Sequence, residues 1–156
     1  MNKNTVTGDF ININLRQLGA TSIKEFNSIM HIAEFDLGDG LIVSYLFNIT
    51  RHNKYFLQRI EPYAMIHGKF ASDQEIIDFI TEDLKRFQNA KNSHNFDTFL
   101  IISHLGHHVT ENIEKLFLNY NVDSENLENI QDEMEDSLRH ILSLFDNSEK
   151  IEFPIK

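Results

Sequence analysis

The chain has no cysteine and no tryptophan, and only two prolines among its 156 residues. Without cysteine there is no disulfide framework, no thiolate zinc site, no iron–sulfur cluster and no cysteine nucleophile. The six glycines are scattered and form neither a G-x-x-x-x-G-K phosphate loop nor a G-x-S-x-G turn around a nucleophilic serine. The residues therefore argue against several large classes of enzyme.

Positive charge and long apolar runs are also scarce. The chain carries 14 Lys and Arg against 24 Asp and Glu, a formal net charge of −10. Its one basic cluster, Lys85, Arg86 and Lys91, is too small for a nucleic-acid footprint. No apolar run approaches the roughly 18–20 residues that span a bilayer, and the first residues lack the apolar stretch of a secretory signal. We expect a cytoplasmic protein with no nucleic-acid partner and no membrane span.

Length and composition favour one packed domain. Apolar residues make up 41% of the chain and charged residues 24%, which is ordinary for a globular protein and too apolar for general disorder. Domains usually run about 100–150 residues. We therefore expect a single domain over residues 1–156, with a sheet in 9–70, helices in 72–145 and a tail in 146–156.

The N-terminal half reads as strands. Ile11, Ile13 and Leu15 alternate with polar residues, which predicts a strand with one apolar face. Gly38-Asp39-Gly40 is a strong hairpin signal, since glycine allows the positive φ of tight turns. Pro62 marks a bulge, a bend or an edge position in the last segment. The expected antiparallel strands are Asp9–Leu18, Ser28–Leu37, Gly40–Thr50 and Tyr55–Phe70.

The C-terminal half reads as three helices, which makes the fold class α+β. Ser72 followed by Glu75 has the form of a capping box and opens an amphipathic stretch. The polar segment 88–95 predicts a loop, after which Asp97 is the expected cap of a second helix. Ser124 is the expected cap of a third helix that ends near Phe145. The alternating tail 151–155 could dock as a short edge strand.

The third expected strand is apolar on both faces. Val43, Tyr45 and Phe47 share one face, and Ile42 and Leu46 share the other. One face can pack on the helices, and the second then needs the C-terminal helix, another subunit or a bound ligand to cover it. We favour another subunit or an apolar binding groove. The expected partner-binding residues are Ile42, Leu46, Tyr55 and Tyr63.

A histidine cluster offers the main alternative chemistry. On a helix, His104, His108 and Glu111 would share one face, and imidazoles are good ligands for zinc, copper and nickel. The apolar residues of the same helix lie opposite, so we interpret the histidines as an exposed patch. The zinc-hydrolase pattern HEXXH is absent because Leu105 stands where the glutamate belongs. A metal-binding enzyme or sensor remains the runner-up hypothesis, and no metal or other cofactor is expected.

The order of elements resembles the SecB-like export chaperones. The resemblance is carried by Asp9–Leu18 as first strand, by the following three strands as a meander, and by the helix that holds Leu105-Gly106 and Ile113-Glu114-Lys115-Leu116. It covers roughly residues 9–120 and shares no diagnostic motif. The resemblance implies a homo-oligomer with apolar grooves that hold unfolded chain segments, without ATP and without catalysis.

These observations favour a non-enzymatic protein that binds unfolded or extended polypeptide, chaperone-like or adaptor-like. A third hypothesis comes from the charge distribution. Residues 121–156 contain 3 basic and 10 acidic side chains, so the last helix carries much of the negative charge. This helix is either a solvated surface or a surface that steers the protein toward a basic partner. In the second case the protein would be an acidic inhibitor or immunity-type protein.

Overall fold

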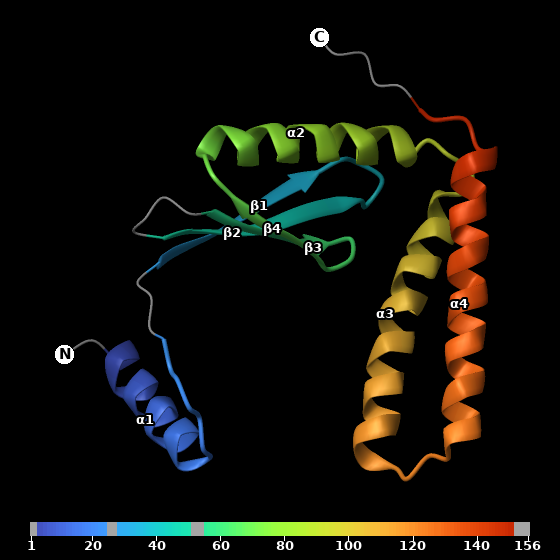
Figure 1. Cartoon of the computed structure of the whole chain (residues 1–156). Coiled ribbons are helices and arrows are strands. Elements are labelled where there is room, and N and C mark those ends of the chain that lie inside the picture. Colours follow the sequence, from blue (N-terminus) through green and yellow to red (C-terminus); the bar gives the residue numbers. More distant parts are fainter. Residues whose placement is uncertain (1–2, 25–27, 51–54, 152–156) are drawn as a thin grey trace. The chain divides into compact units, whose positions relative to one another are not determined.

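The computed structural model describes residues 3–24, 28–50 and 55–151. It confirms the α+β fold class: a four-stranded antiparallel sheet in the N-terminal half is followed by helices (Figure 1). Four helices are present among these residues, where the sequence predicts three. The elements are α1 (Lys3–Gln17), β1 (Ser28–Asp36), β2 (Ile42–Thr50), β3 (Tyr55–Glu61), β4 (Met65–Phe70), α2 (Asp73–Ala90), α3 (Phe96–Asn119) and α4 (Ser124–Asn147).

The sheet is a simple meander in the order β1-β2-β3-β4. The predicted Gly38-Asp39-Gly40 turn joins β1 to β2, and all three residues have positive φ. The Leu37 N–H donates to the Leu41 carbonyl across this turn at 2.9 Å. The turn therefore sets the β1–β2 register, in which Ile32 lies opposite Leu46.

The predicted first strand is wrong, because the segment that holds Ile11, Ile13 and Leu15 is the helix α1. Three alternating residues cannot separate a strand from a helix with apolar side chains on several sides. Each of these three side chains is exposed. A helix pairs its backbone groups internally, whereas a strand needs a neighbour, and α1 has none in the sheet.

The predicted strand over Tyr55–Phe70 is a hairpin instead. β3 ends at Glu61, and Pro62 opens the turn that leads into β4. The Glu61–Pro62 peptide bond is cis. The sheet thus has four strands because the last predicted strand divides in two. Register shifts lie at Ser44/Tyr45 in the β2–β3 pair and at Leu57/Gln58 in the β3–β4 pair.

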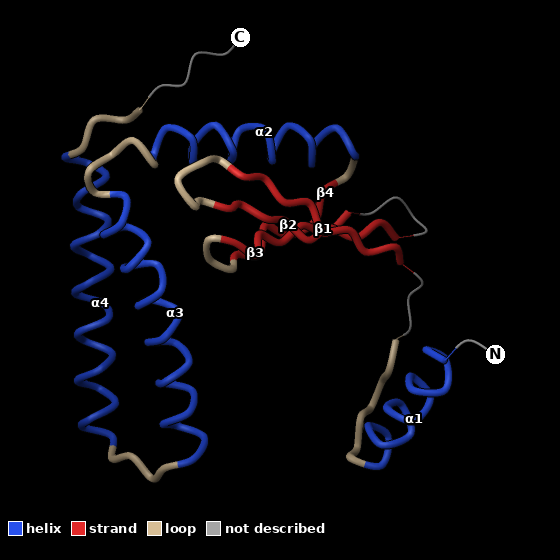
Figure 2. Tube along the Cα trace, turned by 180° about the vertical axis from the view of Figure 1, so that it is seen from behind, coloured by secondary structure: helices blue, strands red, loops and turns tan. Residues whose placement is uncertain are grey.

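The helix α2 lies across one face of the sheet, as Figure 2 shows from behind. It begins as predicted: the Ser72 hydroxyl accepts from the Glu75 N–H at 3.2 Å, and the Glu75 carboxylate accepts from the Ala71 N–H. Its apolar side packs on the central strands. The buried hydrophobic residues are Leu41, Val43, Tyr45, Leu57, Ile76 and Phe87.

The described chain divides into two compact units, one that ends at Ile101 and one that begins at Ile102. In the second unit, the rest of α3 and α4 form a helical hairpin joined by residues 120–123 (Figure 1). No described residue of either helix is buried. None of the described helices is long and apolar enough to cross a membrane.

Two predicted helix caps are wrong by a residue or more. α3 begins at Phe96, so Asp97 lies inside its first turn, and the cap of α4 is Asp123, which accepts from the Asn126 N–H. The predicted loop is shorter than 88–95, because α2 continues to Ala90. Ile151 has no regular structure, and the rest of the predicted tail strand lies outside the described residues.

Candidate functional site

The sheet face opposite α2 carries three cross-strand rows of side chains. Residues that pair across neighbouring strands have their side chains on the same face of the sheet, so the register shows which residues form each row. The central row is Ile32, Leu46, Gln58 and Ile66. The row on one side is Met30, Asn48, Phe56 and Lys69. The row on the other side is Glu34, Ser44 and Glu61. We call these three rows, with Ile42, the open face.

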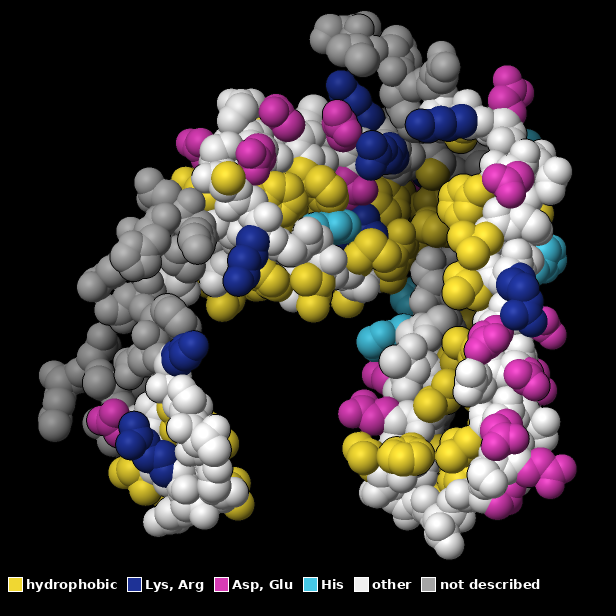
Figure 3. Space-filling view, viewed as in Figure 1, with side chains coloured by type: hydrophobic (Ala, Val, Ile, Leu, Met, Phe, Trp, Pro, Cys, Tyr) yellow, Lys and Arg dark blue, Asp and Glu magenta, His cyan; other side chains and the backbone are white. Residues whose placement is uncertain are grey.

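The open face carries exposed apolar side chains on its two edge strands, β1 and β4. Met30 and Ile32 are each 63% exposed and Ile66 is 67% exposed, whereas Val43 and Tyr45 on the other face are fully buried. Figure 3 shows hydrophobic side chains gathered along the sheet on the side away from α2. A contiguous exposed apolar surface of this kind marks an interaction site more often than an ordinary protein surface.

No strand of the described residues pairs with the outer edge of β1, and this free edge borders the open face. β1 is nine residues long and contains no lysine or proline, which are common protections of an edge strand. The Leu37 N–H bonds to the Leu41 carbonyl, and in an antiparallel pair every second residue bonds to the neighbouring strand. The backbone N–H and C=O groups of Ile32 and Glu34 therefore point toward the free edge. The opposite edge, β4, is shorter and carries Gly68 and Lys69 beside a register shift. β1 is therefore the edge better suited to pair with an added strand.

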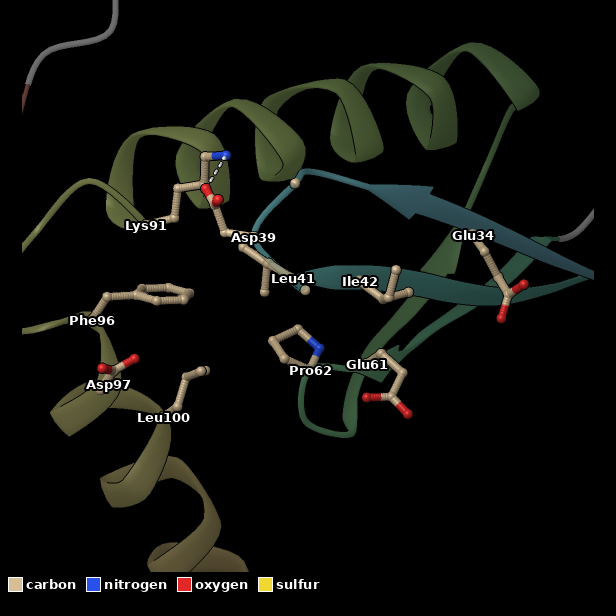
Figure 4. A pocket seen from close by; sticks show the side chains of 12 residues that line it. Glu34, Asp39, Leu41, Ile42, Glu61, Pro62, Lys91, Phe96, Asp97 and Leu100 are labelled. Atoms are coloured by element: carbon tan, nitrogen blue, oxygen red, sulfur yellow. Dashed lines mark ion pairs between the residues drawn. The ribbon is translucent and has the colours of Figure 1, made fainter.

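A hollow of about 550 Å³ lies at one end of the open face, and four of its five charged lining residues are acidic. Glu34 and Glu61 project near Ile42, and the Asp39–Lys91 ion pair stands at the other side of the hollow (Figure 4). Lys91 Nζ lies 3.5 Å from Asp39 Oδ2 and also donates to the Leu37 carbonyl. Among the described residues, Glu34 and Glu61 have no ion-pair partner. This end of the open face is thus suited to a positive charge.

The face under α2 holds a buried polar cluster. Arg59 Nη1 donates to Asp83 Oδ2 at 2.7 Å, and the Tyr45 hydroxyl donates to the same oxygen at 2.7 Å. Arg59 is only 2% exposed. Burial raises the pKa of Tyr45, and its hydrogen bond to Asp83 raises it further, so the hydroxyl stays a neutral donor. The cluster ties β2 and β3 to the middle of α2.

Aromatic rings surround the guanidinium of this cluster. Arg59 Cζ lies 4.4 Å from the Tyr63 ring centroid and 4.8 Å from that of Phe87. Such cation–π contacts favour a guanidinium that has lost its water. Figure 3 shows acidic, basic and histidine side chains enclosed by hydrophobic ones between the sheet and α2. A cavity of about 370 Å³ opens beside them.

His67 lines this cavity and makes stability depend on pH. Partial burial and then the charge of Arg59 lower the pKa of His67 below its usual value of 6.5. As pH falls below about 6.5, the unfolded chain binds a proton before the folded one does, so the free energy of unfolding decreases. The slope stays well under the one-proton limit of about 1.4 kcal/mol per pH unit, because solvent screens the partly exposed ring.

Urea denaturation between pH 7.5 and 5.5 measures this effect. We expect the His67→Gln variant to lose part of the acid destabilisation, whereas His94→Gln, at an exposed position, keeps the wild-type profile. Equal profiles for wild type and His67→Gln would contradict the role assigned to His67.

The structure separates the four predicted partner-binding residues. Ile42 and Leu46 lie on the open face, as the parity of the strand predicts. Tyr55 lies on the other face, where it lines an apolar pocket against α2 with Ile76 and Ile80. Tyr63 also faces α2, with its ring centroid 6.2 Å from that of Phe87. Two of the four residues can therefore contribute to one surface.

The histidine cluster is exposed, and its contacts differ from the predicted set. His107 Nε2 lies 3.2 Å from Glu111 Oε1, and His108 Nδ1 lies 3.3 Å from Glu111 Oε2. His104, the third predicted ligand, is exposed and is not part of either contact. Within the described residues, no group of three His, Asp or Glu side chains is arranged to hold a metal ion.

Sequence reasoning missed the outer part of the open face and the buried ion pair, although signals for both were present. Counting back from the Gly38-Asp39-Gly40 turn places Ile32 opposite Leu46. Arg59 alternates with Leu57 on the buried face of β3. Asp83 follows Ile76 by seven residues, about two helical turns, and so lies on the same apolar side of α2. Two opposite charges at core positions are expected to pair.

No known protein-family model, curated protein or solved structure matches the chain.

Proposed function

We propose that this protein is a non-enzymatic polypeptide-binding protein, chaperone-like or adaptor-like. Its partner is an extended apolar segment of another chain, which pairs with the edge of β1 and continues the sheet. The observation that carries the proposal is the set of exposed apolar side chains on the open face, with Met30 and Ile32 beside an unprotected edge.

The edge favours an extended segment as the occupant. An added strand would take up the outward N–H and C=O groups of Ile32 and Glu34, which apolar contacts alone cannot satisfy. Its alternate side chains would lie next to Met30 and Ile32 and lengthen, by one strand, the row in which Ile32 already lies beside Leu46. Each fully buried large apolar side chain contributes about 1.5–3 kcal/mol.

The acidic end of the open face selects the sequence of the segment. Glu34 and Glu61 stand at this end without ion-pair partners among the described residues. A lysine or arginine at the corresponding end of the segment would lie beside Glu34 on β1 and complement it. The SecB-like resemblance fits this function, although one of the elements that carried it, Asp9–Leu18, lies in α1 and the turn after it.

The test uses a fluorescein-labelled peptide of alternating valine and threonine with lysine at one end, as long as β1. Fluorescence anisotropy should show binding to the wild-type protein. We expect Ile32→Glu to weaken binding at least about tenfold, since it removes apolar contact and places a charge in the row. Ile77→Glu changes a comparably exposed isoleucine of α2, outside the open face, and should leave the affinity unchanged.

Two further results decide the proposal. A peptide with glutamate in place of lysine should bind more weakly, and added salt should reduce the difference. No binding by the wild type, or equal binding by Ile32→Glu and Ile77→Glu, would overturn it. Sedimentation tests the other occupant: a dimer that Ile32→Glu dissociates and that excludes the peptide would assign the open face to a second copy.

A further inference from the structure

The guanidinium of Arg59 uses only one of its nitrogens in a strong hydrogen bond. Nη1 donates to Asp83, whereas Nη2 has the Met65 thioether at 3.6 Å as its acceptor. Nε is buried and has no partner in the described part of the chain. Sulfur is a weak acceptor, so the Nε–Nη2 side of the guanidinium keeps two parallel donors without an oxygen.

Arg59 lines the cavity of about 370 Å³ under α2 together with Met65, whose sulfur covers Nη2. The volume lies within the range of small-molecule sites. Buried charged donors are nearly always satisfied in folded proteins, and a planar guanidinium matches a carboxylate through two parallel bonds. The unpartnered Nε therefore points to an oxygen-bearing ligand, and the guanidinium geometry points to a carboxylate.

The remaining walls define the rest of the ligand. The apolar lining residues are Tyr63, Met65, Phe79, Phe87, Ala90 and Phe99. Arg86 stands at the exposed rim, where its Nη2 donates to the Glu82 carboxylate at 3.1 Å, and Asp83 supplies one negative charge inside. His67 Nε2 is a further buried nitrogen without a partner among the described residues. This balance suits a single negative charge on an apolar body better than a dianionic phosphate.

We propose that this cavity binds a small monocarboxylate with an aromatic or apolar body, whose carboxylate accepts the Nε and Nη2 hydrogens of Arg59. Met65 is 46% exposed and is the side chain that must move, because its sulfur contacts Nη2. Its flexible thioether can leave at little cost. The cavity lies on the face under α2, so it is independent of the peptide-binding surface on the open face.

The test is an NMR titration of the isotope-labelled protein with phenylacetate, followed through the side-chain Nε–H resonance of Arg59 and the methyl resonance of Met65. We expect both resonances to shift and saturate together. Phenylacetamide has the same shape without the charge and should bind at least about tenfold more weakly, since it loses charge-assisted hydrogen bonds.

Two variants localise the site without changing the buried ion pair. Ala90→Leu fills the cavity from the end of α2 and should weaken phenylacetate binding at least about tenfold. Gln88→Leu makes the same kind of change at an exposed neighbour and should have no effect. Equal binding of phenylacetate and phenylacetamide, equal binding by Ala90→Leu and wild type, or an Arg59 resonance that does not move would overturn the proposal. A bound water alone would give this last result.

Discussion

Replacing Asp83 with alanine is expected to lower the free energy of unfolding by about 3–5 kcal/mol, the cost of leaving a buried charge unpaired. Asp83 Oδ2 accepts from both Arg59 and Tyr45, so the variant deprives two buried donors of their acceptor. Arg59 has little access to water that could replace the carboxylate. Urea denaturation followed by circular dichroism measures the loss.

Two further variants separate the ion pair from general effects on α2. Asp78→Ala removes an exposed carboxylate of the same helix, which accepts from Gln74, and should cost well under about 1 kcal/mol. The double variant Arg59→Met/Asp83→Leu should be more stable than Asp83→Ala, because it buries no unpaired charge. If Asp83→Ala is as stable as Asp78→Ala, the assigned role of the buried cluster is wrong.

Replacing Leu57 with alanine should cost about 2–5 kcal/mol of unfolding free energy, through lost apolar burial and the cavity that remains. Leu57 is fully buried in the middle of β3, where it pairs with Phe47 on one side and Gly68 on the other. Gly68 has no side chain to fill the space. Thermal and urea unfolding should both show the loss.

Ile66→Ala is the matched control for Leu57→Ala. It removes part of a similar aliphatic side chain from the adjacent strand, but Ile66 lies on the open face and is mostly exposed. We expect its unfolding free energy to stay within about 1 kcal/mol of wild type. Comparable losses in the two variants would mean that the open face is buried in solution, which would contradict the proposed binding surface.

The sequence predicts the sheet where turn chemistry and alternation agree. The glycines of the β1–β2 turn fix one hairpin, and from this turn the parity of β2 correctly separates Ile42 and Leu46 from Val43 and Tyr45. Ser72 and Glu75 likewise specify the start of α2 through local hydrogen bonds. These features depend on residues that are close together in the chain, so a short stretch of sequence is enough to predict them.

The errors arise where the outcome depends on distant partners. Ile11, Ile13 and Leu15 alternate as in a strand, but the segment is a helix. A strand needs a neighbouring strand to pair with, and the residues of the segment do not reveal whether one is present. The faces of Tyr55 and Tyr63 depend on the register of β3 and on the turn at Pro62. The cavity beside Arg59 lies where β3 meets α2. The two residues in contact there, Arg59 and Asp83, are 24 positions apart in the sequence.

Amide hydrogen exchange along β1, with and without the valine–threonine peptide, tests the proposed function most directly. In the free protein, the N–H groups of Ala33 and Phe35 should exchange slowly, and those of Ile32 and Glu34 should exchange fast, because only the first pair bonds to β2. Bound peptide should protect Ile32 and Glu34. Binding that leaves the exchange of these two amides unchanged would contradict strand addition at β1.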